Sequence, residues 1–575
     1  MFKKAYIYVI IYMKRKLKLM KKKRAKKDIM KKNNFVQGAF IATLGIIITK
    51  ILGILYVIPF YAIIGEKGGA LYGYAYSIYL FFMAISSAGI PLAISKIISE
   101  YQTLGYYDAK KRAFKIGKQI AISLGILCFI ILFVFAPQLA QAILGDLKGG
   151  NTIEDVTFVI RVISTAIIVV PVLSIYRGYF EGHKFITPTA VSQVLEQIMR
   201  VLVIVVGSFV TLKVFNLSLT TAVGVAVFGA TVGSLASYLY LIDKRFKNKE
   251  RFEEKELDKE EPKISNKMIF KKIMWYAFPL IMIDIFKSLY GMVDTVTVVK
   301  ALGPVYGTKT AESIMSILST WAAKFNMIII SISTGMIVSL IPNLTASSVV
   351  GNTKDVHKKI NQSLQMLIFL ALPMTVGLSF LAKPVYTLFY GASKYGPSVL
   401  SFYVFVALIT ALFTTAVTIT QVLKYYKVVF ISLLSGLILK ALVNVSLINQ
   451  FYSLGLPAYY GSILASILGY GLSLIICLVA LHKKCGVNYE ETIKQTFNSI
   501  CGTVLMVISL VILKLIVPIY STSRFLNIFI IIVYAIVGII VYFFYMHKTN
   551  SLQEVFGDKF LKKFHIKTNK TKKVN

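Results

Sequence analysis

About fourteen long apolar runs divide this sequence, and they limit the folds that it can adopt. Each run has at least about 18 residues, the length that an α-helix needs to cross the hydrocarbon core of a bilayer. Hydrophobic residues make up 57% of the 575 positions and charged residues only 15%. The sequence therefore predicts an all-α integral membrane protein. The predicted spans are 35–64, 70–98, 117–144, 155–179, 187–212, 216–242, 270–299, 311–344, 357–383, 397–423, 428–450, 455–481, 492–518 and 524–546.

Lysine and arginine in the loops predict the orientation of these spans. The loops 99–116, 345–359 and 482–491 are rich in both residues, whereas 145–154 and 451–456 are nearly bare. Basic loops stay in the cytoplasm during insertion. We therefore expect a multi-pass protein of the cytoplasmic (inner) membrane with both termini in the cytoplasm.

Basic ends and one charged interior segment predict how the chain is organised. The net charge of +39 is concentrated beside the membrane spans, which indicates contact with anionic membrane lipids and no binding of nucleic acid. The expected regions are a basic extension (1–34), an N-lobe of six helices (35–243), a charged cytoplasmic linker (244–269), a C-lobe of six helices (270–481), two further helices (482–546) and a basic tail (547–575).

Glycines spaced by a constant interval predict that the two lobes are repeats. Three pairs are each separated by 246 residues: Gly89 and Gly335, Gly105 and Gly351, and Gly145 and Gly391. Both lobes begin on the cytoplasmic side, so the repeat is parallel, about an axis along the membrane normal. Lobes related in this way typically enclose a central site and rock around it.

Ionisable residues inside the predicted spans are candidates for that site, because a charge within the bilayer is costly and rarely present without a function. They comprise six cations and three acids. These residues are Lys50, Arg161, Glu196, Arg200, Asp284, Lys287, Asp294, Lys324 and Lys440.

The fifth predicted span carries a polar stripe. Thr189, Gln193, Glu196 and Arg200 follow a spacing of i, i+4, i+7 and i+11, which places them on one face of a helix. Two interpretations are open: Glu196 and Arg200 neutralise each other, or the stripe lines a wet cavity. The neighbouring glutamine and threonine favour the cavity.

The seventh span also carries charges on one face. Asp284 and Lys287 are spaced so that they can pair, whereas Asp294 has no comparable partner on this helix. Asp294 is therefore a candidate ligand for a proton or a sodium ion. Lys50 lies mid-span without an acid within four positions, so it must face another helix's carboxylate, water or an anionic ligand.

Motifs of common enzymes are missing from the sequence. It contains neither a phosphate-binding G-x-x-x-x-G-K-[ST] loop nor an H-E-x-x-H zinc motif, and its histidines fall in predicted loops and the tail. We expect no enzymatic activity and no cofactor, with Na⁺ or H⁺ as the open choices for a coupling ion.

Three stretches resemble a known family. IITKILGILYVIPFYAIIG (47–65), GIPLAISKIISEY (89–101) and YRGYFEGHKFITPTAVSQVLEQIMRV (176–201) are similar to the polysaccharide-export branch of the multidrug/oligosaccharidyl-lipid/polysaccharide (MOP) exporter superfamily. Within it they resemble the Gram-positive lipid II flippases and the stage V sporulation protein B group. The resemblance implies a two-lobed, fourteen-helix protein that moves an undecaprenyl-pyrophosphate-linked peptidoglycan precursor outward by alternating access.

The resemblance also implies which residues meet the cargo. Lys50 matches the first-helix arginine of better-known relatives and Lys324 an eighth-helix arginine, whereas Tyr56 and Val57 replace an Arg-Asp pair. The expected cavity cations are Lys50, Arg200, Lys324 and Lys287, and the expected polar, acidic or ion-coupling residues are Glu196, Gln193, Asp284 and Asp294.

Other functions remain open from the sequence. They are a multidrug or cation antiporter of the same superfamily, a flippase for another wall or spore-cortex precursor, and a scaffold without transport activity. Other cell-wall synthesis proteins are candidate partners.

Overall fold

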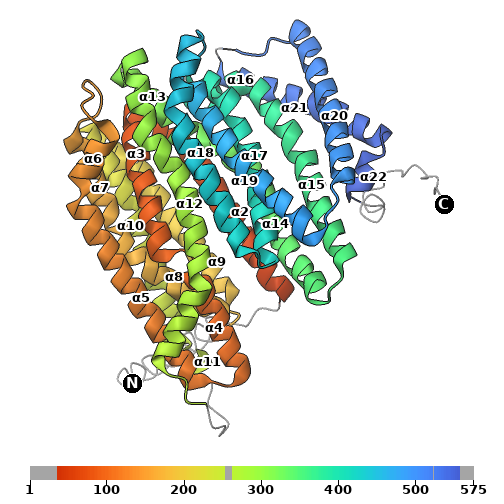
Figure 1. The fold of residues 1–575 in the computed structure, drawn as a ribbon. Coiled ribbons are helices and arrows are strands. Elements are labelled where there is room, and N and C mark those ends of the chain that lie inside the picture. Colours follow the sequence, from red (N-terminus) through yellow and green to blue (C-terminus); the bar gives the residue numbers. More distant parts are fainter. Residues whose placement is uncertain (1–34, 253–261, 522, 557–575) are drawn as a thin grey trace, which may run out of the picture.

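The computed structural model shows an elongated bundle of helices (Figure 1), described over residues 35–252, 262–521 and 523–556. No strand occurs within these ranges. The predicted extension 1–34, the middle of the linker and most of the tail lie outside the described residues. The elements of the first half are α2 (Phe35–Leu55), α3 (Val57–Ser87), α4 (Ile90–Leu104), α5 (Tyr107–Val134), α6 (Ala136–Leu144), α7 (Ile153–Ser164), α8 (Ala166–Gly182), α9 (Ile186–Leu202), the π-helical turns η1 (Val203–Gly207) and η2 (Val210–Val214), α10 (Leu219–Lys247) and α11 (Lys249–Phe252).

The second half continues with the same kind of structure. Its elements are α12 (Asn266–Tyr306), α13 (Thr308–Ser316), the π-helical turn η3 (Ile317–Trp321), α14 (Ala322–Val349), α15 (Thr353–Phe380), α16 (Ala382–Tyr390), α17 (Gly396–Val422), α18 (Tyr426–Ser453), α19 (Tyr459–Cys485), α20 (Glu490–Ile516), α21 (Arg524–Lys548) and α22 (Ser551–Phe556).

Twelve segments of the described residues are long and apolar enough to cross a membrane. Two further helices, α2 and the 41-residue α12, correspond to the first and seventh predicted spans. Together they account for the about fourteen spans expected from apolar runs of membrane length. The prediction of an all-α membrane protein is confirmed.

The first two predicted spans are joined differently from the expectation. The first span is interrupted at Tyr56, between α2 and α3, and no loop separates it from the second span. Instead α3 runs on through a kink at Gly65, where φ is 64° and ψ is −164°. A residue with a Cβ rarely adopts this backbone, so glycine permits the kink.

Backbone geometry repeats between the two halves. Pairs of residues with left-handed or otherwise positive φ recur 246 or 240 residues apart, which shows equivalent turns in the two lobes. The pairs are Gly105 and Gly351 (79° and 75°), Gly145 and Gly391 (61° and 80°), and Lys184 and Lys424 (63° and 64°). Gly89 and Gly335 differ, since Gly89 has a φ of 69° between α3 and α4 whereas Gly335 lies within the continuous α14.

Helices α3 to α10 lie on one side of the bundle and α14 to α21 on the other (Figure 1), and α12 packs against both α3 and α18. Helices α20 and α21 pack on α15 and α16 at the outer edge. The charged linker enters α12 at the lower end of Figure 1, which we call the linker end. Helices α13 and α16 lie at the opposite end.

We predict that Gly461→Ala destabilises the C-terminal half. A Cβ at position 461 would lie 2.4 Å from the backbone nitrogen of Ile448 on α18, whereas a Cβ at Gly471, on the same helix α19, would meet nothing within 4 Å. Forcing an extra carbon into a packed contact costs about 1–3 kcal/mol, and helix interiors gain up to about 1 kcal/mol from Gly→Ala. Thermal unfolding in detergent should show a lower midpoint for Gly461→Ala and an equal or higher one for Gly471→Ala. Equal losses in both variants would contradict this packing.

Candidate functional site

A cavity of about 520 Å³ lies between the two halves of the bundle. Its lining comes from α2, α3, α9, α12, α13, η3, α14 and α17, together with Tyr56 between α2 and α3. The charged residues among the described lining are Lys50, Arg200, Asp294 and Lys324. The structure thus brings together three of the four predicted cations and one of the predicted acids.

Two cavity lysines have no acidic partner among the described residues. The Lys50 ammonium donates a hydrogen bond to the Thr334 hydroxyl on α14 at 3.2 Å. The Lys324 ammonium donates to the Tyr56 hydroxyl at 3.3 Å and lies 5.3 Å from the centroid of its ring. Both contacts join α2, or the residue that follows it, to α14. Neither contact neutralises the charge, so both ammonium groups remain available to an anion.

The third cation, Arg200, shares one carboxylate with a second arginine. Glu196 Oε2 is paired with Arg177 at 2.8 Å, and its Oε1 is paired with Arg200. Arg177 also donates to Ser192 and Ser237, each at 3.0 Å. One carboxylate thus faces two guanidinium groups, which leaves an excess positive charge beside the cavity.

The polar stripe of α9 has features of both interpretations that the sequence leaves open. Glu196 pairs with Arg200, and Arg200 also lines the cavity. Neither Glu196 nor the partly buried Gln193 belongs to the described lining, in which Gln197 takes part instead. Spacing along one helix could not identify Gln197, because the cavity wall depends on how α2 and α9 pack.

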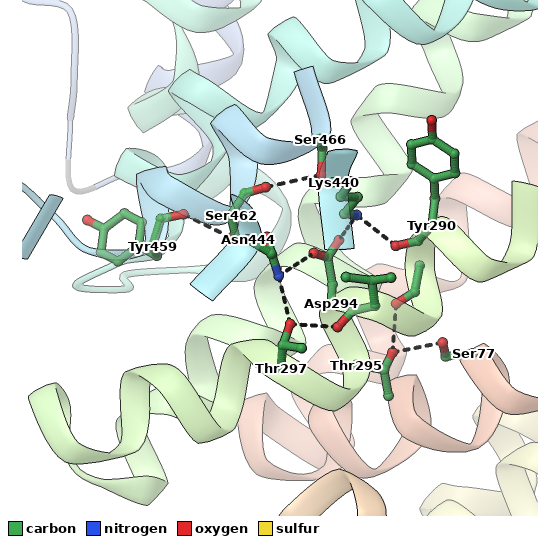
Figure 2. A network of polar contacts seen from close by, with 12 residues as sticks. Ser77, Tyr290, Asp294, Thr295, Thr297, Lys440, Asn444, Tyr459, Ser462 and Ser466 are labelled. Carbon is green, nitrogen blue, oxygen red and sulfur yellow. Dashed lines mark hydrogen bonds and ion pairs between the residues drawn. The ribbon is translucent and has the colours of Figure 1, made fainter. Parts of the chain in front are cut away.

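Asp294 on α12 is paired with Lys440 on α18, as Figure 2 shows. The ammonium lies 2.7 Å from Oδ2 of Asp294 and also donates to the Tyr290 carbonyl at 2.7 Å. The Lys440 side chain is 2% exposed and that of Asp294 is 21% exposed. Spacing in the sequence gives Asp294 no comparable partner on its own helix, and the partner in the structure comes from α18, a helix that spacing along α12 could not identify.

Further hydrogen bonds extend this network in two directions (Figure 2). The Asn444 amide donates to the Thr297 hydroxyl at 2.7 Å and lies 3.5 Å from Oδ1 of Asp294. Thr295 donates to Ser77 on α3 at 2.7 Å, which joins α12 to the other half. Arg200 on α9 and Lys440 on α18 are 240 residues apart, the same interval as Lys184 and Lys424. The two lobes therefore place a paired cation at equivalent positions.

Asp284 and Lys287 do not join the cavity. Neither belongs to its described lining, and neither forms an ion pair with a described residue. The pairing between them that their spacing allows is not formed.

The end opposite the linker is closed by aromatic side chains. Trp321, which is fully buried, lies with its ring centroid 5.0 Å from that of Tyr61 and 5.5 Å from that of Tyr390. A Cβ at Gly69 of α3 would lie 2.6 Å from the Trp321 indole, so only glycine lets the ring approach this closely.

Polar contacts close the same end across the two halves. Glu66 on α3 accepts hydrogen bonds from Ser313 and, at 2.9 Å, from Ser393. The buried Glu312 on α13 accepts from the backbone nitrogen of Asn151 at 2.9 Å and from its amide at 3.1 Å. These contacts must break before the cavity can open at that end.

Two helical lobes around a central cavity are the architecture of the MOP-superfamily fold. The solved structure titled "Lipid II flippase MurJ, inward closed conformation" has a TM-score of 0.64 at 15% identity, covering 92% of this chain and 100% of that chain. An inward-facing multidrug resistance MATE family transporter has a TM-score of 0.58 at 13% identity, covering 77% and 98%. At sequence identities as low as these, the structural similarity establishes a shared fold and nothing further.

Sequence comparison identifies the family. The "Polysaccharide biosynthesis protein" family model matches residues 35–347. The lipid II flippase MurJ of Bacillus subtilis (strain 168) is 34% identical over 535 residues, which cover 91% of this chain and 97% of the relative. Stage V sporulation protein B of the same organism is 29% identical over 212 residues, covering 37% and 39%. The chain belongs to the polysaccharide biosynthesis protein family, in the flippase branch of the MOP superfamily, and is a multi-pass membrane protein.

We predict that single substitutions in the Asp294–Lys440 pair are strongly destabilising and not additive. Removing one partner of a buried ion pair leaves an uncompensated charge, at a cost of about 3–5 kcal/mol. Asp294→Asn and Lys440→Met should each lower the thermal unfolding midpoint in detergent, and the double variant should lose less than the sum. Lys287→Met, on α12 but outside the pair, is the control and should have a smaller effect. Additive losses in the double variant would contradict the pairing.

Proposed function

We propose that this protein is a lipid II flippase, which moves the lipid-linked peptidoglycan precursor from the inner to the outer leaflet by alternating access. The observation that carries the proposal is the pair of cavity lysines, Lys50 and Lys324, that have no acidic partner among the described residues. The flippase of B. subtilis, 34% identical along nearly its full length, supports the choice of cargo. The MurJ flippase and the MATE family transporter named above are transport proteins, in keeping with a protein that performs no catalysis.

The cavity cations suit a pyrophosphate group. Each unpaired ammonium inside a membrane costs about 2.5–3.5 kcal/mol on insertion scales, so two of them need compensation. Pyrophosphate is a compact anion with several acceptor oxygens, and hydrogen bonds to charged groups are stronger than neutral ones. Lys50 and Lys324 lie on opposite halves of the bundle and would meet the headgroup from both sides, with Arg200 as the third cation.

The proposed orientation places the linker end in the cytoplasm. The basic loops and termini predict this orientation. The end closed by Trp321, Glu66 and Glu312 would then face outward, so the cavity would receive its cargo from the inner leaflet. Outward movement would require these contacts to open and the linker end to close, which is alternating access about a central site.

The membrane potential would favour export of an anionic headgroup. A potential that is negative inside contributes about 2.3 kcal/mol per charge per 100 mV. Lys440 already supplies the positive charge that faces Asp294. We therefore propose that Asp294 positions Lys440 and does not bind a free sodium ion, so that the potential drives the cycle.

Two other functions are less well supported. A multidrug or cation antiporter of the same superfamily shares the fold, but it would use acidic residues at the cavity. Asp294, the acid of the described lining, is paired with Lys440, and Glu196 beside the cavity is held by two arginines. A flippase for another wall or spore-cortex precursor is favoured only by the partial similarity to stage V sporulation protein B. Contact with other cell-wall synthesis proteins stays a prediction.

We predict that the wild-type protein restores growth and outer-face lipid II in a strain depleted of its essential lipid II flippase. Lys50→Ala and Lys324→Ala should each reduce the lipid II that becomes accessible outside by about tenfold or more, since a hydrogen bond to a charged group contributes about 1.5–3 kcal/mol.

Lys514→Ala is the matched control, because Lys514 is an exposed lysine of α20 that does not line the cavity. It should support normal export. Normal export by both cavity variants, at equal protein levels, would overturn the proposed role of the two lysines. Failure of the wild-type protein to complement would overturn lipid II as the cargo.

A further inference from the structure

A second hollow lies near the linker end, and we call it the linker-end trough. It consists of two adjoining cavities of about 800 and 600 Å³, which share Trp275, Phe278, Pro279 and Tyr426 in their lining. Its walls come from α4, α12 and the start of α18. None of its described lining residues also lines the central cavity, so the two are separate sites.

Lysines surround one part of the trough. Lys96 of α4, Lys271 of α12 and Lys424 of the α17–α18 connection line the larger cavity, and all three are exposed. None of the three forms an ion pair with a described residue, and the described lining contains no carboxylate. Glu100, one turn from Lys96 on α4, is already paired with Lys272 at 2.6 Å. The mouth therefore carries three cations that form no ion pair with a described residue, while the carboxylates of Glu100 and Glu181 lie along an adjoining hollow that Lys96 also lines.

Two of these lysines, Lys96 and Lys424, have constrained positions. The Lys96 ammonium lies 3.9 Å from the centroid of the Tyr276 ring on α12, a cation–π contact that joins α4 to α12. Lys424 has a φ of 64°, a conformation that is uncommon for a residue with a side chain. This backbone turn fixes the direction in which the Lys424 side chain leaves the main chain.

Beyond these three lysines the trough is lined mainly by apolar side chains, with Lys427 as the one charged residue of the smaller cavity's described lining. Phe278, Met282 and Phe286 line it from α12 at intervals of four residues, which places them along one face of that helix. Phe430 and Leu433 line it from α18. Trp275, at the junction of the two cavities, is 76% exposed, and tryptophan is enriched where membrane helices meet the headgroup layer.

We propose that the linker-end trough binds one anionic phospholipid, with its phosphate among Lys96, Lys271 and Lys424 and an acyl chain along the apolar groove between α12 and α18. Basic pockets between transmembrane helices bind anionic lipid headgroups through the same arrangement of charge. The separation from the central cavity favours a resident lipid over the transported cargo. Because the phosphate would contact α4, α12 and the α17–α18 connection together, the bound lipid would stabilise the packed arrangement of α4 and α12.

The two tryptophans of the chain allow a direct test. Trp275 lies in the trough, whereas Trp321 is fully buried at the opposite end. The full chain is reconstituted into phosphatidylcholine vesicles that contain a small fraction of either phosphatidylglycerol or phosphatidylcholine with brominated acyl chains. Bromine quenches tryptophan fluorescence on contact. Brominated phosphatidylglycerol should quench several-fold more strongly than brominated phosphatidylcholine, and Trp275→Phe should remove the difference.

Charge variants identify the headgroup site. Lys96→Gln, Lys271→Gln and Lys424→Gln should each weaken the apparent affinity for phosphatidylglycerol by about fivefold, the effect of one lysine near an anionic headgroup. A variant with Lys354, Lys358 and Lys483 changed to Gln removes three charges, as many as the three trough lysines carry together, from exposed positions outside the trough and should keep the preference. Lys50→Ala should also keep it, which separates this test from the proposed transport function.

Three results would overturn the inference. Equal quenching by the two brominated lipids would show ordinary contact with bulk bilayer. Equal loss of preference in the control variant would show a general effect of surface charge. Selective quenching that persists in Trp275→Phe would place the lipid elsewhere.

Discussion

The cost of burying charge away from water governs the polar residues of this bundle. Several deep charges are paired: Glu196 with Arg177 on α8 and with Arg200 on its own helix α9, and Asp294 on α12 with Lys440 on α18. These pairs attach α8 to α9 and α12 to α18, so each fixes one wall of the central cavity. Lys50 and Lys324 differ, because their described partners are hydroxyl groups. These two lysines bring positive charge without a described ion-pair partner into the cavity, where an anion can compensate it.

The closed end and the cavity depend on each other. Trp321 and the contacts of Glu66 and Glu312 join the two halves at the end opposite the linker. The same stretch of chain, η3 followed by α14, carries Trp321 into the closed end and Lys324 into the cavity. A cargo that draws Lys50 and Lys324 together can therefore act on the closed end through a single segment. This connection is the physical basis that we propose for alternating access.

Much of the fold could be predicted from the sequence, because spans of membrane length and repeated glycines are local signals. The cavity positions of Lys50, Arg200 and Lys324 could also be predicted from the sequence, because each is a costly charge within an apolar run. The ion-pair partners that lie on different helices could not be predicted from the sequence. Asp294 and Lys440 are 146 residues apart, and only the packing of α12 on α18 brings them together. The polar, glycine-rich sequence GEKGG (65–69) predicts a loop between two spans, whereas in the structure α3 continues through it with a kink at Gly65.

The most direct measurement is the binding of lipid II to the purified protein by native mass spectrometry, compared with undecaprenyl monophosphate, which has the same tail and one phosphate fewer. If the unpaired lysines hold the pyrophosphate, the wild-type protein prefers lipid II, and the Lys50→Ala/Lys324→Ala variant binds it about tenfold or more weakly and loses the preference. Unchanged affinity and an unchanged preference in the folded double variant would contradict the account.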